Sequence, residues 1–396
     1  MKHEVKIAHS MSDKTGEIQD CDQHFNETAD RAAHSARKIP RLVPHAKRSG
    51  LLHDWGKLTD GWQDFARKLR EKGGDHAALG AMIAFDQGLP EVAMAILGTH
   101  VGIPNRNLGG DTEDASSRIQ RWVSEHGCEY EKTFIPEAFE PLETLSDLSD
   151  IESELATRFI FSCLAEADIR NTKEHFEGKR KVFQYPPIED LLKMMMSYHD
   201  EVVEASDPTD LNMAREELFS NAMGLADGPT GIYTLNAPTG LGKTLTMTAF
   251  ALKHASLTGK DRVIVVMPFL SIVRQTAKLF KKVFGEDNVV EHHSSIEWDE
   301  TNPIQRERLE LAAEDWDAPI IITTAVQFYE SLFGNMGSRC RKNKNIANSV
   351  VINDEVQSLP HKFLHPIYEM IEQVSDQWNT TFILSSATQN DNEKLI

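Results

Sequence analysis

The stretch Leu51-Leu52-His53-Asp54-Trp55-Gly56-Lys57 places a histidine beside an aspartate directly after two leucines. Further histidines surround it in the sequence, because eight of the sixteen in the chain lie within the first 100 residues. Imidazole and carboxylate are together suitable ligands for a divalent transition metal, which can generate hydroxide from water near neutral pH. The pattern therefore indicates a metal site. Taken alone, His53-Asp54 fits an amphipathic helix with its polar residues in water equally well.

The composition is that of a globular protein. With 396 residues, the chain is long enough for two or three domains that each bury a core. Hydrophobic residues make up 40% and charged residues 26%. No apolar run approaches the length of a membrane span and the N-terminus has no signal-peptide hydrophobic region, so we expect a cytoplasmic protein without a membrane partner. The four cysteines are too far apart for a metal or redox pair, and we expect reduced thiols.

The net charge of -19 argues against a protein that coats nucleic acid non-specifically, because neutralising phosphates requires clustered lysine and arginine. Local basic clusters do occur, just before His53 and at 179–181, 278–282 and 339–344. Such clusters are more often solvated surfaces than binding sites. They permit a nucleic-acid groove without predicting one.

The first half of the sequence predicts a bundle of helices. Apolar residues recur at helical spacing in 24–38, 45–57, 76–85, 91–100, 151–170 and 188–203. The polar, glycine-rich stretch 105–116 predicts a mobile loop. Turn-forming residues are concentrated between Ser206 and Asp210. We therefore expect an all-α domain at 1–205, a linker at 206–212 and a second domain at 213–396.

The second half has a different pattern, in which short apolar runs alternate with helical stretches. The predicted strands are 232–236, 263–267, 320–323, 349–352 and 381–384. Buried strands that alternate with helices form a parallel sheet with helices on both faces. The sequence therefore predicts a multi-domain chain in which an all-α bundle is followed by an α/β domain with a parallel sheet.

A phosphate-binding loop is predicted at Ala237-Pro238-Thr239-Gly240-Leu241-Gly242-Lys243-Thr244, between a predicted strand and a predicted helix. Glycines let backbone N–H groups face phosphate oxygens, Lys243 can reach the β- and γ-phosphates, and Thr244 can hold magnesium. We expect ATP with Mg to bind at Thr239, Gly240, Gly242, Lys243 and Thr244.

Two carboxylates follow the predicted strand 349–352, namely Asp354 and Glu355. Asp354 suits the magnesium ion of a bound nucleotide. Glu355 could orient or deprotonate the attacking water, and we predict a catalytic role for it. An acidic turn after a strand would otherwise be unremarkable, but here a P-loop precedes it in the sequence.

Alanine at position 237, where the general P-loop pattern has glycine, makes this region similar to the superfamily 2 helicases. Ser385-Ser386-Ala387-Thr388 resembles the helicase motif that couples the nucleotide cleft to nucleic acid. The resemblance implies contacts with single-strand phosphates at strand ends, at Pro268, Thr323, Thr324, Ser386 and Thr388. A helicase cleft is completed by a second RecA-like domain, and the sequence ends eight residues after Thr388. We therefore expect weak or absent ATPase activity unless a separate chain supplies that domain.

A His-Asp region ahead of a superfamily 2 helicase core resembles the signature helicase-nuclease of type I CRISPR systems, and the resemblance covers the entire chain. In that family an all-helical HD domain binds metal through a lone His, a His-Asp pair, a later His, a His-His pair and a final Asp. The matching positions are His24, His53, Asp54, His76, His100 and Asp168. Val101 replaces the second member of the His-His pair. The resemblance implies one firm metal at His24, His53, Asp54 and Asp168, and a weak or substrate-assisted second at His76, His100 and Asp54.

The resemblance further implies metal-dependent cleavage of single-stranded DNA in antiviral defence, coupled in the full system to ATP-dependent unwinding. His53 and Asp54 would act in the cleavage, Lys57 could add positive charge beside the scissile phosphate, and a CRISPR RNA-guided surveillance complex would be the partner. Ligation rich in histidine favours Mn, Fe, Co or Ni over Mg. Two alternatives remain open, an HD phosphohydrolase acting on nucleotides and a non-catalytic module that docks to the surveillance complex.

Overall fold

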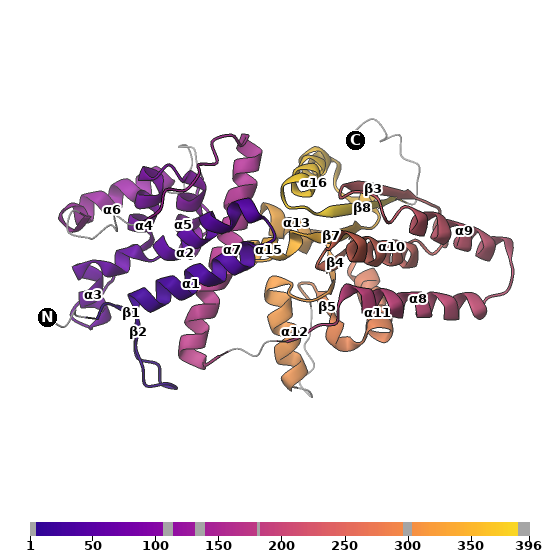
Figure 1. Cartoon of the computed structure of the whole chain (residues 1–396), viewed down its shortest axis with the longest axis horizontal. Coiled ribbons are helices and arrows are strands. Elements are labelled where there is room, and N and C mark those ends of the chain that lie inside the picture. Colours follow the sequence, from indigo (N-terminus) through magenta and orange to yellow (C-terminus); the bar gives the residue numbers. More distant parts are fainter. Residues whose placement is uncertain (1–4, 106–113, 131–138, 180–182, 296–302, 387–396) are drawn as a thin grey trace. The chain divides into compact units, whose positions relative to one another are not determined.

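The computed structural model describes residues 5–105, 114–130, 139–179, 183–295 and 303–386. The chain forms two compact units (Figure 1). The first unit contains Met1–Val182 together with Gly334–Lys344, and the second contains Phe183–Phe333 and Asn345–Ile396. No helix among the described residues combines the length and the apolar character needed to cross a membrane.

The first unit is almost entirely helical. A short antiparallel pair of strands, β1 (Ile7–His9) and β2 (Gln19–Asp20), precedes the helices. The helices and 3-10 turns are α1 (Cys21–Ala36), η1 (Pro40–Leu42), α2 (Val43–Leu52), η2 (Trp55–Leu58), α3 (Asp60–Ala66), α4 (Ala77–Asp86), α5 (Pro90–Val101), α6 (Ala115–Tyr130), α7 (Asp150–Glu177) and α14 (Gly337–Cys340). The short helix α15 (Asn343–Ile346) begins in this unit and ends in the second.

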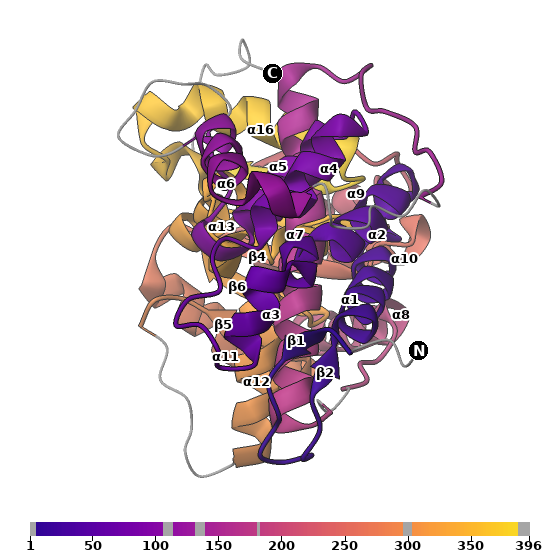
Figure 2. The ribbon, with the colours of Figure 1, turned by 90° about the vertical axis from the view of Figure 1, so that its left-hand side faces the viewer.

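Helices α1, α2 and α5 pack against the long helix α7, and α1, α2 and α7 lie side by side in Figure 2. Small residues allow their backbones to approach closely. A Cβ atom at Gly50 would lie 2.5 Å from the Cα of Ala29, and one at Gly80 would lie 1.8 Å from the carbonyl oxygen of Leu52. Only glycine therefore fits at these two crossings. They hold the C-terminus of α2 between α1 and α4.

Several helices of the first unit differ from the expectation. Helix α2 ends at Leu52 rather than at residue 57, because the backbone turns there into the 3-10 segment η2. Helix α7 continues to Glu177 rather than 170, and a capping box of Ser149 and Glu152 fixes its start. Helix α6 was not predicted. It begins within the stretch interpreted as a loop, of which residues 106–113 lie outside the described residues.

The second unit contains a sheet and the helices that cover it. The strands are β3 (Ile232–Asn236), β4 (Arg262–Met267), β5 (Val289–His292), β6 (Ile320–Thr324), β7 (Ser349–Asn353) and β8 (Thr381–Ser386). The helices and 3-10 turns are α8 (Ile188–Glu204), α9 (Asp210–Gly224), α10 (Lys243–Thr258), α11 (Leu270–Phe284), η3 (Glu286–Asn288), α12 (Pro303–Asp315), α13 (Ala325–Phe333), η4 (Val356–Ser358), η5 (His361–Phe363) and α16 (Leu364–Gln377).

The six strands form one parallel sheet in the order β3-β8-β7-β4-β6-β5, which confirms the predicted parallel sheet. Strand β5, at one edge, was not predicted. Right-handed crossovers place α10 and α11 on one face and the helices that follow β5, β6 and β7 on the other. Val263, Val265 and Met267 of β4 point into the core beneath α10 and α11. This arrangement brings the carboxyl ends of all strands to one edge, where ligands of such sheets bind.

The division between the units falls at 182/183 rather than within the predicted linker at 206–212. Helix α8 packs on α10, and its side chains Leu191 and Met195 belong to the same core as Phe250. The turn-rich stretch 206–210 therefore joins α8 to α9 within one unit. Turn-forming composition marks a reversal of the chain, and it does not distinguish a turn inside a domain from a linker between two domains.

Candidate functional site

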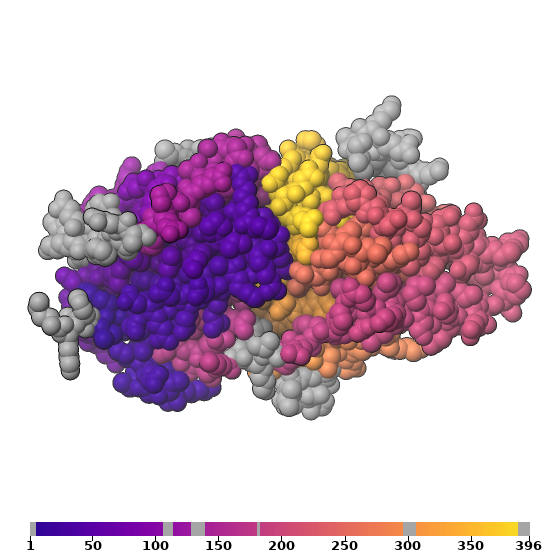
Figure 3. Space-filling view, viewed as in Figure 1, coloured from indigo at the N-terminus to yellow at the C-terminus, as the bar shows by residue number. Residues whose placement is uncertain are grey.

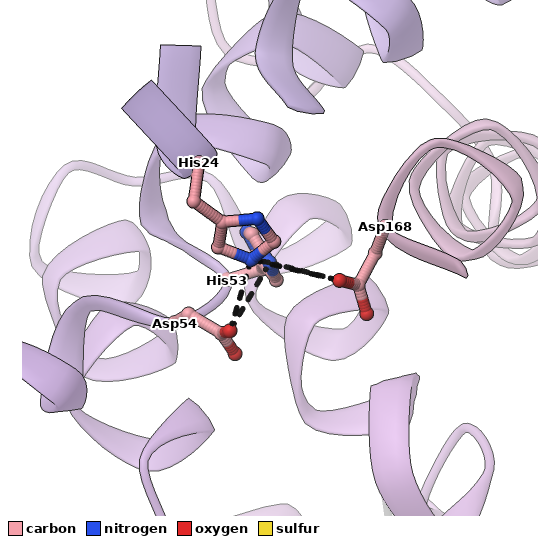
Figure 4. Close-up of side chains that lie close together, drawn as sticks. All are labelled: His24, His53, Asp54 and Asp168. Carbon is pink, nitrogen blue, oxygen red and sulfur yellow. Dashed lines mark hydrogen bonds and ion pairs between the residues drawn. The ribbon is translucent and has the colours of Figure 1, made fainter. Parts of the chain in front are cut away.

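Four of the predicted metal ligands meet inside the first unit, and Figure 4 shows them converging from two helices and the turn after α2. His24 comes from α1, His53 and Asp54 follow α2, and Asp168 comes from α7. The Nε2 atoms of the two histidines are 3.1 Å apart. Neither His24 nor His53 is exposed to solvent. In Figure 3 the outer side of this region is a continuous indigo surface, the colour of α1 and α2. We call these four residues the first cluster.

The spacing of the first cluster fits a metal ion. Asp54 Oδ2 lies 3.3 Å from His24 Nε2 and 3.4 Å from His53 Nε2. Asp168 Oδ1 lies 3.6 and 3.5 Å from the same two nitrogens. Ligands held about 2.1 Å from a transition metal lie about 3.0 to 3.4 Å from one another, so the distances of Asp54 fall within this range and those of Asp168 lie slightly above it. In addition, Asp54 Oδ1 is buried and accepts no hydrogen bond from the described residues, as expected of an oxygen placed to bind a cation.

Hydrogen bonds to the other ring nitrogens fix the tautomers of both histidines. Asn171 Oδ1 lies 2.7 Å from His24 Nδ1 and also accepts a hydrogen bond from Gln19 Nε2 at 2.9 Å. The carbonyl oxygen of Gly50 lies 2.8 Å from His53 Nδ1. Because these oxygens can only accept, each Nδ1 must donate, so that in the neutral form of each ring the lone pair is on Nε2 and is directed into the cluster. Metal-binding histidines are typically oriented in this way.

A second group of possible ligands shares Asp54 with the first. Asp54, His76 and His100 form this second cluster, with His76 Nε2 at 3.5 Å from Asp54 Oδ1 and the two imidazole rings 4.6 Å apart. Val101, in the position of the family's second histidine, is 61% exposed and offers no ligand atom. The weaker second metal stays a prediction.

The position of His76 is set by its neighbour Asp75. This carboxylate accepts hydrogen bonds from the N–H groups of Ala77 and Ala78 at the start of α4. It also accepts two from the guanidinium of Arg118 on α6, at 2.6 and 3.1 Å. Burial opposes the ionisation of Asp75, but these hydrogen bonds outweigh it and lower its pKa. A partly buried ion pair thus anchors the backbone directly before His76.

Lys57 is buried beside the first cluster rather than exposed on the surface. Its Nζ lies 2.6 Å from Asp54 Oδ2, and both side chains are almost completely inaccessible to water. The ammonium group also lies 5.3 Å from the centre of the Trp62 ring. The ammonium group therefore lies next to the predicted ligands, where it stabilises the ionised form of Asp54.

The charges of the cluster are strongly coupled. Burial alone would lower the pKa of His53, but the charges of Asp54 and Asp168 outweigh burial and raise that pKa above its usual value. Burial would raise the pKa of Asp54, yet His53 and Lys57 hold it well below its usual range. Asp168 also has a lowered pKa, since its hydrogen bond and attraction to His53 overcome burial. Both carboxylates are thus ionised, and His53 holds a proton more firmly than a free histidine.

The affinity of the first cluster for Mn is expected to rise with pH. Metal binds neutral imidazole, so a proton on His53 must leave when the metal enters. Below the raised pKa of His53, affinity should increase by about tenfold per pH unit, and it should level off above that pKa. Titrations of Mn at several pH values measure this slope. A His126→Gln variant, which loses a histidine outside both clusters, should show the same slope, and an affinity independent of pH would contradict the expectation.

The predicted nucleotide residues also lie together, at the carboxyl edge of the sheet in the second unit. Gly240 and Gly242 have φ values of 86° and 76°, which glycine adopts without strain, and α10 begins at Lys243. The Nζ of Lys243 lies 3.3 Å from Glu355 Oε1, after β7. The P-loop and the predicted catalytic carboxylate are therefore in contact.

The other carboxylate, Asp354, is linked to the predicted helicase motif on β8. Ser385 Oγ donates a hydrogen bond to Asp354 Oδ1 at 2.6 Å. Burial raises the pKa of Asp354, an effect that this hydrogen bond opposes. Glu355 has a φ of 55° in the left-handed region, a strained conformation that is often found at functional sites.

The residues predicted to contact nucleic acid differ in their exposure to solvent. Pro268 and Thr324 are partly exposed at the ends of β4 and β6. Thr323 is fully buried and its hydroxyl donates to the carbonyl oxygen of His292 at 2.8 Å, which counts against a contact between that hydroxyl and nucleic acid. Ser386 is largely buried, and Thr388 lies outside the described residues.

Sequence reasoning missed the residues that support the ligands. Asn171 lies three positions after Asp168 on α7, and this helical spacing could have indicated a shared face. Gln19 has no such signal, since its contact with Asn171 spans distant parts of the chain. The ring of His9 packs edge-on against His24 at 4.7 Å, and burial lowers the pKa of His9 to about 3, which keeps it neutral.

The P-loop likewise has supporting residues that the sequence did not reveal. The guanidinium of Arg215 on α9 donates two hydrogen bonds to the carbonyl oxygen of Gly240, at 2.9 and 2.6 Å. Beside this contact lies a cleft of about 670 Å³ between α8, α9 and the P-loop. Its walls are mainly apolar and include Val202, Met213 and Phe219.

Comparison with known proteins supports a relationship to helicases. Residues 221–396 match the DEAD/DEAH box helicase family. The CRISPR-associated nuclease/helicase Cas3 of Haloferax volcanii is 29% identical over 179 residues, which cover 40% of this chain and 19% of that relative. The chain therefore spans about a fifth of the curated relative that it matches.

Solved structures share the fold over nearly the whole chain. The crystal structure of T. fusca Cas3-ATP has a TM-score of 0.63 at 14% identity, and it covers 97% of this chain and 50% of that chain. That of T. fusca Cas3-ADP has a TM-score of 0.62 at 15% identity, with the same coverage. A pre-nicking CRISPR RNA-guided surveillance complex contains a chain with a TM-score of 0.55 at 16% identity, covering 98% of this chain and 48% of its own length. At such identities the likeness shows the fold alone.

Proposed function

Because the chain is a homologue of the Cas3 nuclease/helicases by sequence and fold and has a DEAD/DEAH box helicase domain, we propose that it is a metal-dependent nuclease for single-stranded DNA in type I CRISPR interference. The observation that carries this proposal is the first cluster, in which two buried Nε2 atoms and two carboxylates lie at the spacing of metal ligands. In our interpretation the first unit is an HD nuclease domain and the second is the first RecA-like domain of a helicase motor.

The residues of the first cluster prepare the site for phosphodiester hydrolysis. A Mn, Fe, Co or Ni ion held by His24, His53, Asp54 and Asp168 would supply a Lewis acid and a source of hydroxide at neutral pH. Asn171 and Gly50 keep both Nε2 atoms available, and Lys57 keeps Asp54 ionised. The positive charge of Lys57 would also attract the phosphate backbone to this position.

The second unit would bind ATP with Mg in the same proposal. The phosphates would lie on the P-loop, Asp354 would hold magnesium, and Glu355 would orient the attacking water. The apolar cleft beside Arg215 has space for the base of the nucleotide. Residues 1–396 assayed on their own should hydrolyse ATP slowly, because an arginine finger from a second lobe accelerates such reactions by about 10³ to 10⁵. The proposed partners are single-stranded DNA and an RNA-guided surveillance complex.

Removal of metal is expected to abolish cleavage of circular single-stranded DNA in the absence of ATP, because the metal is the proposed source of the attacking hydroxide. A chelator should stop the reaction, and added Mn or Ni should restore it, as measured by loss of the circular form on a gel. A circular substrate also separates endonuclease from exonuclease activity.

Other outcomes of this assay would contradict the nuclease proposal. Cleavage that persists in chelator would exclude a metal-dependent reaction. Selective hydrolysis of free nucleotides would favour an HD phosphohydrolase, and a chain that binds the surveillance complex but retains no metal would favour a docking module.

A further inference from the structure

The segment Gly334–Lys344 lies in the sequence between α13 and β7, which both belong to the second unit. It nevertheless packs within the first unit. We call it the returning segment. The N–H of Ile103 donates to the carbonyl oxygen of Asn335 at 2.9 Å, and Asn335 Nδ2 donates back to the carbonyl oxygen of Ile103 at 3.3 Å. Arg158 on α7 donates to the carbonyl oxygen of Gly334, so the start of the segment is held from two sides.

These contacts lie immediately after a predicted metal ligand. His100 occupies the last turn of α5, which ends at Val101, and Gly102 turns the chain with a φ of 89°. A Cβ atom on Gly102 would lie 2.9 Å from the carbonyl oxygen of Asn335 and 2.9 Å from Met336 Sδ. The absence of a side chain at Gly102 is therefore what allows the returning segment to reach the end of α5.

The last turn of a helix is its least constrained part, because its carbonyl groups lack intrahelical partners. The second cluster has few ligands, since Val101 contributes none. A metal held by few ligands requires each to be placed within about 0.5 Å of its productive position. The affinity of the second cluster should thus depend on whatever holds the last turn of α5 in place.

We propose that the returning segment is a positioning element for His100, so that the second cluster binds metal only while Asn335 is paired with Ile103. This inference rests on the proposed function of the clusters as metal sites. The segment follows α13, which begins directly after Thr324, and it precedes β7, which leads to Asp354. The segment is therefore hydrogen-bonded to the chain directly after α5 and is joined through the backbone to the elements that carry Thr324 and Asp354.

Two glycine variants test the proposal as a matched pair. Gly102→Ala should force Asn335 away from Ile103, whereas Gly178→Ala has nearly the same φ, 90°, and nothing within 4 Å of the added atom. Titration of Mn followed by electron paramagnetic resonance should show a tight and a weak class of sites in the wild type. We expect Gly102→Ala to keep the tight class and to weaken the other by at least about tenfold. Gly178→Ala should keep both.

Hydrogen exchange provides a readout that does not depend on metal. The amide of Ile103 should exchange faster in Gly102→Ala and at the wild-type rate in Gly178→Ala. A second pair leaves α5 unchanged. Arg158→Met removes the donor to Gly334 and should also weaken the weak class, whereas Glu154→Gln loses only the 2.8 Å ion pair with Arg158 and should not.

Three results would overturn the inference. If the Ile103 amide became exposed in Gly102→Ala while both classes of Mn sites kept their affinities, the returning segment would not position His100, and the nuclease proposal would stand. If the wild-type chain had only the tight class of Mn sites, the second cluster would bind no Mn. The returning segment could then not act by positioning His100 as a ligand. A wild-type chain without any bound Mn would overturn both this inference and the proposed function.

Discussion

Replacing Asp54 by asparagine is expected to slow the cleavage of single-stranded DNA by about a thousandfold or more, since the lost metal would otherwise lower the barrier by several kcal/mol. Asp54 belongs to both clusters, with Oδ2 directed to His24 and His53 and Oδ1 to His76. The neutral amide cannot replace an ionised ligand. Both classes of Mn sites should therefore disappear together with the activity.

The same substitution also leaves Lys57 buried without its carboxylate partner. Removing one member of a buried ion pair costs about 3 to 5 kcal/mol, so Asp54→Asn could lose activity through unfolding. Urea unfolding and circular dichroism measure this contribution. Asp168→Asn separates the two effects, because the buried ion pair of Lys57 within the described part of the chain is with Asp54, and Asp168 belongs only to the first cluster. It should remove the tight Mn class and the activity with a smaller loss of stability.

Asp30→Asn is the matched control for the charge itself. Asp30 lies on α1 and forms an exposed ion pair with Lys47 at 3.3 Å, which contributes about 0 to 1 kcal/mol. Activity and Mn binding should be unchanged in this variant. If folded Asp54→Asn cleaved DNA at the wild-type rate, the first cluster would not be the nuclease site.

The second large effect is expected at the P-loop, where Lys243→Ala should weaken ATP binding by about 30- to 150-fold. A charge-assisted hydrogen bond to phosphate contributes about 2 to 3 kcal/mol, which corresponds to that range of Kd. The Nζ of Lys243 is largely buried and already faces Glu355, so it is directed into the cleft before nucleotide binds. Fluorescence titration with a labelled ATP analogue measures the change.

Lys253→Ala provides the comparison on the same helix. Lys253 lies in α10, away from the P-loop, and donates to the carbonyl oxygen of Met223 at 2.9 Å. This variant should bind ATP with wild-type affinity. Equal binding by Lys243→Ala and the wild type would exclude the P-loop as the phosphate site. Rapid ATP hydrolysis by residues 1–396 that depends on Lys243 would instead indicate that a second copy completes the cleft.

Local sequence patterns were sufficient for several conclusions. The apolar runs of β4, β6, β7 and β8 predicted buried parallel strands, and the glycine spacing around Gly240 predicted a phosphate-binding loop between a strand and a helix. These features depend on side-chain periodicity and backbone conformation within a few residues. The residue types of both clusters were also recognisable, because ligand chemistry is a property of the side chain alone.

Boundaries and short elements were less predictable. The edge strand β5 was missed, and α9 was interpreted in part as a linker. Only the first two of its four residues, Val289 and Val290, are apolar, and so short a run does not indicate a strand. The turn between α8 and α9 has the composition of a linker, and only the packing of α8 against α10 assigns both helices to the second unit.

The sequence by itself thus determined the parallel sheet, the P-loop and the types of ligand available for a metal. Tertiary structure alone decided that the Nε2 atoms of His24 and His53 and Oδ1 of Asp168 lie within 3.6 Å of one another. It also decided that Asn171 fixes the tautomer of His24 and that Gly334–Lys344 packs beside the end of α5. The physical reason is the range of the interactions. Periodicity and turn conformation arise between neighbours in the sequence, whereas these contacts join residues far apart in the chain and form only when the helices pack together.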